Sequence, residues 1–320
     1  MTTATRAATL LFAASLPLFA QAQTWPAKTV RVVTPWPAGG LTDIAGRIVF
    51  QKISENLGQQ FVVDNRGGAT GTIGAEIVAR APADGYTLMV NSMTHLGNPY
   101  IYKKLPYDTI GDFAPVGIMV AQTGLLVVHP SLPVHSVKEL IALAKAKPGE
   151  VNYAAGLVGS ANFLAGELFK QMAGVNLVRI SYKGGGPALN DVIAGQVKIM
   201  FATTGSAMPH VKSGRLRALA VTSAEPTALV PGLPAIAATV PGYESLTFCG
   251  LFVPAKTAPA IIARLNDAAR KYLELTETKE RFLVSGVEAA SSTPQQFDAA
   301  IKADTARVEK VLQATGLRAE

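Results

Sequence analysis

The sequence predicts an α/β fold with largely parallel sheets, because short apolar runs alternate with helical patterns along most of the chain. The pattern is clearest at residues 30–57, where an apolar run precedes apolar side chains at helical spacing and a terminal glycine, Gly58. A chain of 320 residues is longer than one hydrophobic core usually organises, so we expect two domains.

Residues 1–22 have the pattern of a secretory signal peptide. Residues 7–20 are apolar, and residues 20–22 (Ala-Gln-Ala) form an A-x-A cleavage site. The apolar stretch is short for a bilayer span and Pro17 interrupts it, so secretion explains it better than anchoring. We expect cleavage after Ala22 and a soluble mature chain in the periplasm of a Gram-negative cell.

The first strand leads into a loop, residues 35–43, with the sequence Pro-Trp-Pro-Ala-Gly-Gly-Leu-Thr-Asp. Two prolines stiffen the exit from the strand, and Gly39 and Gly40 allow backbone geometry that a Cβ would hinder. The following helix would present free backbone N–H groups at its N-terminus, which favours binding of an anion. An ordinary strand-to-helix turn is the alternative, because glycine-rich turns of this kind are common.

The first unit continues with strands at residues 61–64 and 86–91, separated by a helix that a glycine-rich stretch, residues 67–74, opens. The glycine spacing differs from the dinucleotide fingerprint G-x-G-x-x-G, and no acidic strand end follows about twenty residues later, so we expect no nucleotide here. Ser92 and Thr94 follow the strand at its carboxyl end, where open α/β sheets usually bind ligands.

A second unit begins after residues 122–124. A strand at residues 125–128 is followed by a helix that a capping box of Ser136 and Glu139 opens. Further strands then end in loops of glycine and small polar residues, each before a helix, and we expect ligand contacts there. These loops are residues 156–162, 183–187 and 203–206, the last of which contains Thr203 and Thr204.

The chain then returns to the first unit. An irregular Pro/Gly-rich connection, residues 225–242, precedes a strand around Phe248. Two helices follow, the first capped by Thr257 and the second by Thr293 with Gln296. We therefore assign lobe 1 to residues 23–122 and 248–320, and lobe 2 to residues 123–247.

Several motifs, taken in order, resemble one protein family. Residues 35–43 match the pattern P-[FW]-x-x-G-G-x-x-D, and further matches are Asp64-Asn65-Arg66, Asp84-Gly85-Tyr86-Thr87-Leu88, Asp112-Phe113-Ala114-Pro115-Val116, Tyr182-Lys183-Gly184 and Gly195-Gln196-Val197. Nearly all of the chain after residue 23 thus resembles the receptors of tripartite tricarboxylate transporters, the Bug family. The resemblance implies a two-lobed periplasmic binding protein of type II, whose lobes close on an organic anion in the cleft between them.

The resemblance also implies roles for individual residues. Ala38, Gly39 and Asp43 would belong to the first-lobe wall, with Asp43 orienting water rather than ligand. Trp36 would cover an apolar part of the ligand, although core packing is an equal alternative. With the second-lobe loops and the strand ends added, the candidate ligand-binding residues are Trp36, Ala38, Gly39, Asp43, Ser92, Thr94, Gly159, Ser160, Asn162, Tyr182, Gly184, Gly185, Thr203 and Thr204.

The sequence departs from the family pattern near the expected cleft. Arg179 stands where the family commonly has His, Ala202 where Asp is common, and Phe248 where Trp is common. The motif Pro-Thr-x-x-Glu-x-Gly is eroded at residues 234–240. These departures bear on the identity of the ligand and not on the fold.

Catalytic chemistry has little support in the sequence. The histidines lack metal-ligand spacing, no G-x-S-x-G motif is present, and the glycine-rich loops lack paired carboxylates, so we expect neither a metal nor a cofactor. Cys249 is the only cysteine, which excludes an intramolecular disulfide, and its apolar surroundings predict a buried, inert thiol. A secreted enzyme on the same scaffold is therefore a minor alternative.

The net charge of +7 is spread over scattered lysines and arginines, without the basic run or aromatic interleaving of a nucleic-acid binder. Small anions are the simplest partners for such a surface. We expect a monomeric receptor that delivers a small carboxylate to membrane transporter subunits, or alternatively one that feeds a sensor. The second-lobe loops contain no acid to pair with an ammonium group, which favours an unaminated mono- or dicarboxylate.

Overall fold

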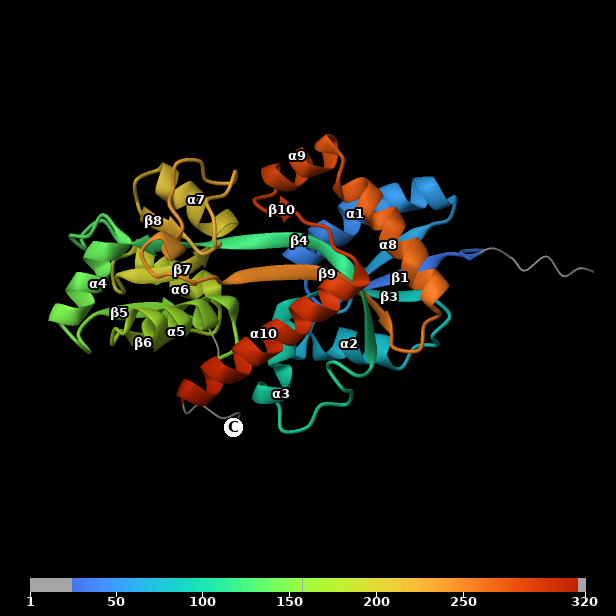
Figure 1. The fold of residues 1–320 in the computed structure, drawn as a ribbon, viewed down its shortest axis with the longest axis horizontal. Helices are drawn as coiled ribbons and strands as arrows, with labels where there is room; N and C mark the ends of the chain where they lie inside the picture. The colour runs from blue at the N-terminus through green and yellow to red at the C-terminus, as the bar shows by residue number, and fades with distance from the viewer. Residues whose placement is uncertain (1–24, 157, 316–320) are drawn as a thin grey trace, which may run out of the picture.

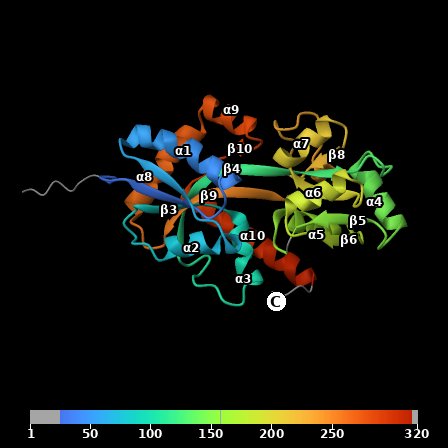
Figure 2. The same cartoon turned by 180° about the vertical axis from the view of Figure 1, so that it is seen from behind.

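This computed structural model describes residues 25–156 and 158–315, so the expected signal peptide and its cleavage site lie outside the described residues. The chain forms two α/β bodies along its long axis, and strands cross from one to the other (Figures 1 and 2). We call the body that contains β1 the first lobe and the body that contains β5 the second lobe. The strand order is β2-β1-β3-β9-β4-β7-β5-β6, with β8 and β10 also paired to β4.

In the first lobe, β1 (Val30–Thr34) lies between β2 (Phe61–Asn65) and β3 (Thr87–Ser92), and both pairings are parallel. Successive side chains of β1 point to opposite faces of the sheet. Val32 packs into the cluster that α1 and α8 cover, whereas Val33 packs into the cluster beside α2. The remaining bounds are α1 (Leu41–Leu57), η1 (Ala69–Gly71), α2 (Thr72–Ala79), η2 (Met93–Gly97), α3 (Asn98–Ile101), α8 (Pro259–Leu273), α9 (Thr276–Val284) and β10 (Glu288–Ala289).

The second lobe repeats this arrangement. Strand β5 (Asn152–Ala155) lies between β6 (Val178–Ser181) and β7 (Ile199–Thr203), again in parallel. Tyr153 packs with Phe163 and Phe169 of α5, whereas Ala154 faces the cluster that includes α6. The other elements are α4 (Val137–Ala146), α5 (Ala161–Ala173), α6 (Gly185–Ile193), α7 (Thr204–Lys212), β8 (Arg217–Val221) and η3 (Ile236–Ala238).

Strands β4 (Phe113–Val128) and β9 (Leu246–Pro254) join the lobes. From Phe113 to Thr123, β4 pairs antiparallel with β9, and from Gly124 to Val128 it pairs antiparallel with β7. The strand expected at residues 125–128 is therefore only the end of a 16-residue strand. The α/β prediction is confirmed, but the parallel sheets meet through antiparallel pairs around β4 and β9.

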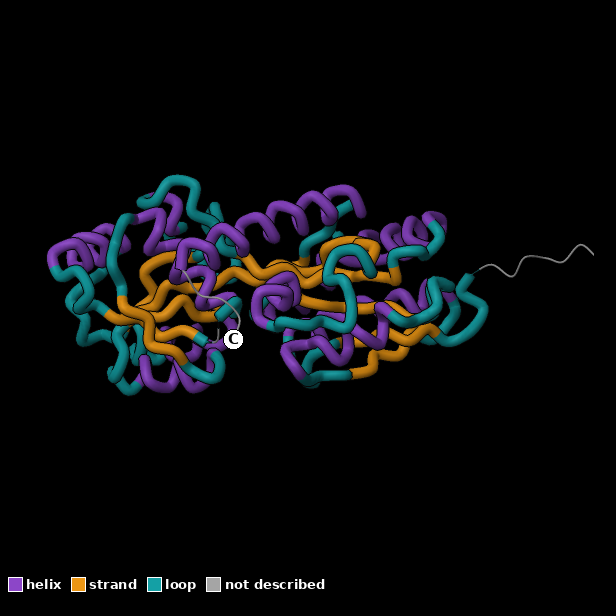
Figure 3. Tube along the Cα trace, turned by 90° about the horizontal axis from the view of Figure 1, so that it is seen from below, coloured by secondary structure: helices purple, strands orange, loops and turns teal. Residues whose placement is uncertain are grey.

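Helix α10 (Pro294–Thr315) runs along both lobes (Figures 1 and 3). Phe297 and Ile301 near its start are buried in a first-lobe cluster, whereas Val308 and Leu312 near its end are buried in a second-lobe cluster. Its capping box is confirmed, because the Gln296 amide donates to Thr293 Oγ1 at 3.2 Å and the Thr293 amide donates to Gln296 Oε1 at 2.9 Å. The lobes are thus connected by α10 as well as by the strands.

Other predicted helix ends agree only in part. Ser136 caps α4 as expected, accepting from the Glu139 amide at 3.1 Å, and Gly58 ends α1 in a left-handed conformation. The Thr257 cap is wrong. The N-cap of α8 is Ala258, and the Thr257 hydroxyl donates to the carbonyl of Pro254 at 2.7 Å because the preceding strand brings that acceptor within reach.

Candidate functional site between the lobes

A cavity of about 660 Å³ lies between the two lobes, a volume typical of small-molecule sites. The first lobe contributes the loop between β1 and α1, the second lobe contributes the loops before α5 and α6, and the joining strands contribute Gln122 and Thr247. The described residues that line it are Trp36, Pro37, Ala38, Gly39, Gly40, Leu41, Thr42, Thr70, Ser92, Gln122, Val158, Gly159, Ser160, Ala161, Lys183, Gly184 and Thr247.

The first-lobe wall is built on the N-terminus of α1. Gly39 has φ +81, a left-handed conformation that favours glycine, and Gly40 is the N-cap. The first N–H groups of a helix lack intrahelical acceptors, so the amides at Leu41 and Thr42 are available at the cavity. This wall can therefore bind an anion through its backbone.

Asp43 lies beneath this wall and stands outside the set of described lining residues. It is 4% exposed, and its carboxylate accepts from the Gly39 amide at 2.8 Å and from Arg47 Nε at 2.9 Å. Burial raises the pKa of Asp43, and hydrogen bonds from Arg47, the Gly39 amide and Asn65 more than offset it, so the pKa lies below its usual value. An ionised Asp43 thus holds the loop from behind.

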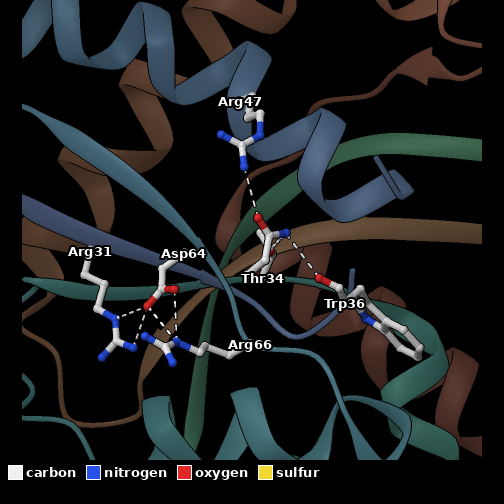
Figure 4. A network of polar contacts seen from close by, with 7 residues as sticks. Arg31, Thr34, Trp36, Arg47, Asp64 and Arg66 are labelled. Atoms are coloured by element: carbon white, nitrogen blue, oxygen red, sulfur yellow. Dashed lines mark hydrogen bonds and ion pairs between the residues drawn. The ribbon is translucent and has the colours of Figure 1, made fainter. Parts of the chain in front are cut away.

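Trp36 is held at two points. Its indole Nε1 donates to Oδ1 of the buried Asn91 at 2.8 Å, and its carbonyl accepts from Asn65 Nδ2 at 3.2 Å. A Cβ at Gly71 would lie 3.4 Å from the Trp36 ring, so Gly71 leaves space for the indole. Figure 4 shows the Trp36 carbonyl joined to the group of side chains by Thr34 that Arg47 contacts from the other side. The ring is positioned at the cavity and does not belong to the core clusters.

The second-lobe wall is built on the N-termini of α5 and α6. Gly159, at φ +82, precedes Ser160, which is the N-cap of α5, and Gly184 is the N-cap of α6. Asn162 lies just behind, where its Oδ1 accepts from the Ser160 hydroxyl at 2.6 Å and from the Gly156 amide at 3.2 Å. Asn162 therefore orders the loop and lines an adjoining space of about 30 Å³, rather than the main cavity.

Some sequence-predicted residues lie away from the main cavity. The Tyr182 hydroxyl donates to Asp191 Oδ2 at 2.7 Å, and burial together with this bond raises the pKa of Tyr182 to about 12. The Thr204 hydroxyl donates to the Thr123 carbonyl at 2.5 Å, and Thr203 shares a 2.7 Å hydrogen bond with Ser206. Gly185 is the first residue of α6, one position beyond the lining residue Gly184. The side chain of Thr94, in η2, lies outside the described residues.

Sequence reasoning placed Trp36, Ala38, Gly39, Ser92, Gly159, Ser160 and Gly184 at positions that share this cavity. It missed other lining residues: Pro37, Gly40, Leu41, Thr42, Thr70, Gln122, Val158, Ala161, Lys183 and Thr247. Pro37, Gly40, Leu41, Thr42 and Lys183 belong to family motifs that also contain a predicted site residue, so their positions in those motifs could have identified them. Gln122 and Thr247 carry no such signal, because only the pairing of β4 with β9 brings them together.

The electrostatics of the cavity favour an anion. Helices α1, α5 and α6 each begin at the cavity, and helix N-termini carry partial positive charge. Among the described residues that line it, none is acidic and Lys183 is the cationic one. Trp36, Pro37, Leu41 and Val158 add an apolar surface. The arrangement suits a molecule that has both carboxylate and hydrocarbon parts.

The described residues contain no group of three His, Cys, Asp or Glu side chains close enough to hold a metal ion. Cys249 is fully buried, and burial raises its pKa well above the usual value. The same described residues include no helix that is both long and apolar enough to cross a bilayer.

Comparison with known proteins agrees with this geometry. Residues 45–317 match the family model described as "Tripartite tricarboxylate transporter family receptor". Protein BugT of Bordetella pertussis is 33% identical over 300 residues, covering 93% of this chain and 92% of BugT. The Rpa4515 structure of R. palustris with adipate has a TM-score of 0.78 at 36% identity, covering 92% of this chain and all of that one.

The structure of MatC from Rhodopseudomonas palustris with bound malate is also similar. It has a TM-score of 0.71 at 28% identity, covering 90% of this chain and 100% of MatC. The family model and the relatives each extend over both lobes of this chain. The chain therefore belongs to the tripartite tricarboxylate transporter family of receptors, and its fold is that of a two-lobed periplasmic binding protein.

Proposed function

We propose that this protein is an extracytoplasmic receptor that captures a small organic carboxylate in the interlobe cavity by closure of its lobes. The observation that carries the proposal is the convergence of the N-termini of α1, α5 and α6 on a cavity whose described lining residues include no acid. Backbone N–H groups at helix N-termini can hold a carboxylate without an arginine.

The ligand that fits best is an unaminated mono- or dicarboxylate with an aliphatic or aromatic portion. An ammonium group would need an acidic partner, and the nearby Asp43 is already bonded to Gly39 and Arg47 behind the wall. The related structures with adipate and malate contain unaminated dicarboxylates, which supports the same class here. The apolar surface around Trp36 favours a ligand with hydrocarbon of its own.

Closure would bring the two walls together about β4 and β9. We assign residues 23–122 and 248–320 to one moving lobe and residues 123–247 to the other. The bulges in β4, at Pro115/Gly117, Ile118/Val120 and Leu126/Val127, interrupt regular pairing on both sides of the boundary and support bending there. Helix α10 packs on both lobes and would slide or tilt during closure.

The family supports export and delivery to membrane transporter subunits, so the proposal includes cleavage after Ala22 and a periplasmic, monomeric, cofactor-free protein. The proposed role is binding, not catalysis. A receptor that feeds a signalling system is the second candidate. A secreted enzyme on the same scaffold would be revealed by turnover of the bound acid.

Titration calorimetry of the mature protein tests this function. The panel contains adipate, malate and benzoate on one side, and aspartate and glutamate on the other. We expect micromolar binding of at least one plain acid and no binding of the amino acids. Micromolar binding of an amino acid with no plain acid bound would refute the proposed ligand class. Native mass spectrometry of the purified protein adds an independent test by identifying any acid that co-purifies.

A further inference from the structure

Arg47 connects two parts of the first-lobe wall from a position outside the set of described lining residues. Its Nε donates to Asp43 Oδ1 at 2.9 Å, and its Nη2 donates to Asn65 Oδ1 at 3.0 Å. The planar guanidinium can hold both acceptors at once because its donors form a rigid fork. One side chain of α1 is thus bonded both to its own helix and to the end of β2.

The two acceptors of Arg47 each hold one end of the cavity loop. Asp43 Oδ2 accepts from the Gly39 amide at 2.8 Å. Asn65 Nδ2 donates to the Trp36 carbonyl at 3.2 Å and to Thr34 Oγ1 at 2.6 Å. Figure 4 shows Arg47 directed toward the group that joins Thr34 and Trp36. The segment 36–39 is therefore held at its first and last residues.

This segment has few other attachments. Pro37, Ala38 and Gly39 are exposed. The Trp36 indole is bonded to Asn91, and the Gly40 amide donates to the Pro37 carbonyl at 3.4 Å. Two prolines limit the torsion angles but supply no donor. The Trp36 ring is thus held by Asn91, whereas the backbone of the loop depends largely on Asp43 and Asn65 for its position relative to the amides of α1.

We propose that Arg47 is a positioning residue for ligand binding, which holds segment 36–39 in its anion-binding geometry through Asp43 and Asn65. The inference rests on the proposed function of the cavity. Arg47 does not contact the ligand. Its bridge between two elements places the backbone of Trp36 and Gly39 correctly relative to the first amides of α1.

The exposure of Arg47 separates this role from a role in global stability. The Arg47 side chain is 54% exposed, and exposed ion pairs contribute little to the free energy of unfolding. The Asp43 side chain is only 6% exposed, so loss of Arg47 removes a donor from a nearly buried carboxylate. Loss of Arg47 should therefore change the position of the Asp43 carboxylate and of the loop whose Gly39 amide it accepts from.

The chain offers a matched control. Arg80 pairs with Glu76 on α2 at 2.7 Å, with the same four-residue spacing, and the Arg80 side chain is 69% exposed. The variants are Arg47→Gln, Arg47→Lys and Asn65→Asp, with Arg80→Gln as the control. Arg47→Lys keeps a charge for Asp43 but loses the fork. Asn65→Asp keeps an acceptor for Arg47 but loses the donors to Trp36, Thr34 and Asp43, and it places a second carboxylate beside Asp43.

The first measurement is hydrogen exchange of the ligand-free mature protein over residues 36–40. We expect exchange about tenfold faster in Arg47→Gln and in Asn65→Asp, a smaller increase in Arg47→Lys, and no change in Arg80→Gln. Melting temperatures should fall by no more than a few degrees in the Arg47 and Asn65 variants and stay unchanged in Arg80→Gln, so that faster exchange over residues 36–40 reports local opening of the loop. Unchanged exchange in both Arg47→Gln and Asn65→Asp would overturn the positioning role.

The second measurement is adipate affinity by calorimetry. Arg47→Gln should weaken binding by about tenfold and Arg47→Lys by less, whereas Arg80→Gln should bind like the wild type. Equal affinities of wild type and Arg47→Gln would overturn the link between the bridge and binding. If the wild type bound none of the plain acids, the proposed function would fail instead, and the exchange measurement would still decide whether Arg47 holds the loop.

Discussion

The indole Nε1 of Trp36 donates a 2.8 Å hydrogen bond to Oδ1 of Asn91, and this bond connects the cavity loop to the carboxyl end of β3. Asn91 is fully buried, and its Oδ1 also accepts from the Ser92 amide at 2.8 Å. A buried acceptor with fixed donors leaves the indole one favoured orientation. The ring is thus held in one orientation at the cavity.

Trp36 should report ligand binding by its fluorescence. The other tryptophan, Trp25, packs against Phe61 and Tyr86, away from the residues that line the cavity. We expect a bound plain acid to change the emission of the wild type. Trp36→Phe should remove this change and weaken binding by about three- to tenfold, because it loses ring area and the bond to Asn91. A ligand-dependent signal that persists in Trp36→Phe would contradict the placement of the ring at the ligand.

Gly184→Val should block the second-lobe wall. Gly184 has an extended φ of 170°, and a Cβ there would meet nothing within 4 Å, so valine enters the cavity without backbone strain. We expect binding to weaken at least about a hundredfold from steric exclusion of the anion. Gly186→Val is the control, because Gly186 also has open space for a Cβ but stands outside the described lining residues.

Lys183→Ala should weaken binding less than Gly184→Val does. Lys183 is exposed, and helix N-terminal amides supply the main donors in this proposal. We expect a loss of about threefold to tenfold, measured by calorimetry at low and high salt. Complete loss of binding in Lys183→Ala, with Gly184→Val still active, would show that the charge and not the backbone holds the anion.

Ligand should compact and stabilise the protein. At a hundredfold excess over Kd the stabilisation should be about 2.7 kcal/mol, which corresponds to a rise of several degrees in Tm. Small-angle scattering should give a smaller radius of gyration with a saturating plain acid, and Gly184→Val should show neither effect. Identical dimensions with and without a tightly bound acid would exclude lobe closure.

Tyr182→Phe should leave ligand affinity within about twofold, because the hydroxyl bonds to Asp191 and not to the cavity. The raised pKa of Tyr182, about 12, means that the folded protein keeps this proton while the unfolded chain loses it near pH 10. The tyrosine therefore contributes stability that declines as pH rises from about 10 towards 12. Absorbance titration of wild type and variant should show one late-titrating tyrosine missing in Tyr182→Phe.

The free energy of unfolding should decrease as the pH is lowered from 6.5 to 4, because His95 is buried in its neutral form. Burial lowers the pKa of His95 to about 4, although hydrogen bonds to the backbone oppose this shift. Between pH 6.5 and 4 the unfolded chain therefore binds a proton at His95 and the folded protein does not. Burial and Lys198 lower the pKa of His129 too, whereas burial raises that of Asp304 and acts in the opposite direction. Urea unfolding at pH 7 and 5 should therefore show a smaller decline in His95→Asn than in His129→Asn; equal declines would contradict the assignment.

The sequence predicted the strand, loop and helix at residues 30–57 because their signals are local. Gly39 at φ +81 and Gly58 at φ +64 occupy left-handed backbone where side chains are strained, so their places could be read without the fold. The caps at Ser136 and Thr293 are equally local, since donor and acceptor are three residues apart. Thr257 failed as a cap because the Pro254 carbonyl of the preceding strand offered its hydroxyl another partner.

The length of β4 could not be read in this way. Residues 122–124 look like a break in the sequence, yet the Gly124 amide donates to Thr222 Oγ1 at 2.8 Å and the strand continues. Its partners, β9 and β8, lie far along the chain and close the sheet across the lobes. Non-local pairing thus decides how the lobes are joined.

Loops rich in glycine and small polar residues, each followed by a helix, can be recognised from local sequence, so the presence of backbone amides suited to an anion was predictable. Which of those loops share a cavity depends on how the strands pair across the lobes. The Tyr182 hydroxyl donates to Asp191 and not to the cavity. Gln122 and Thr247 both line the cavity because β4 pairs with β9. The physical reason is that a backbone conformation follows from neighbouring residues, whereas the direction of a polar side chain follows from whichever partner the packed fold brings within hydrogen-bond reach.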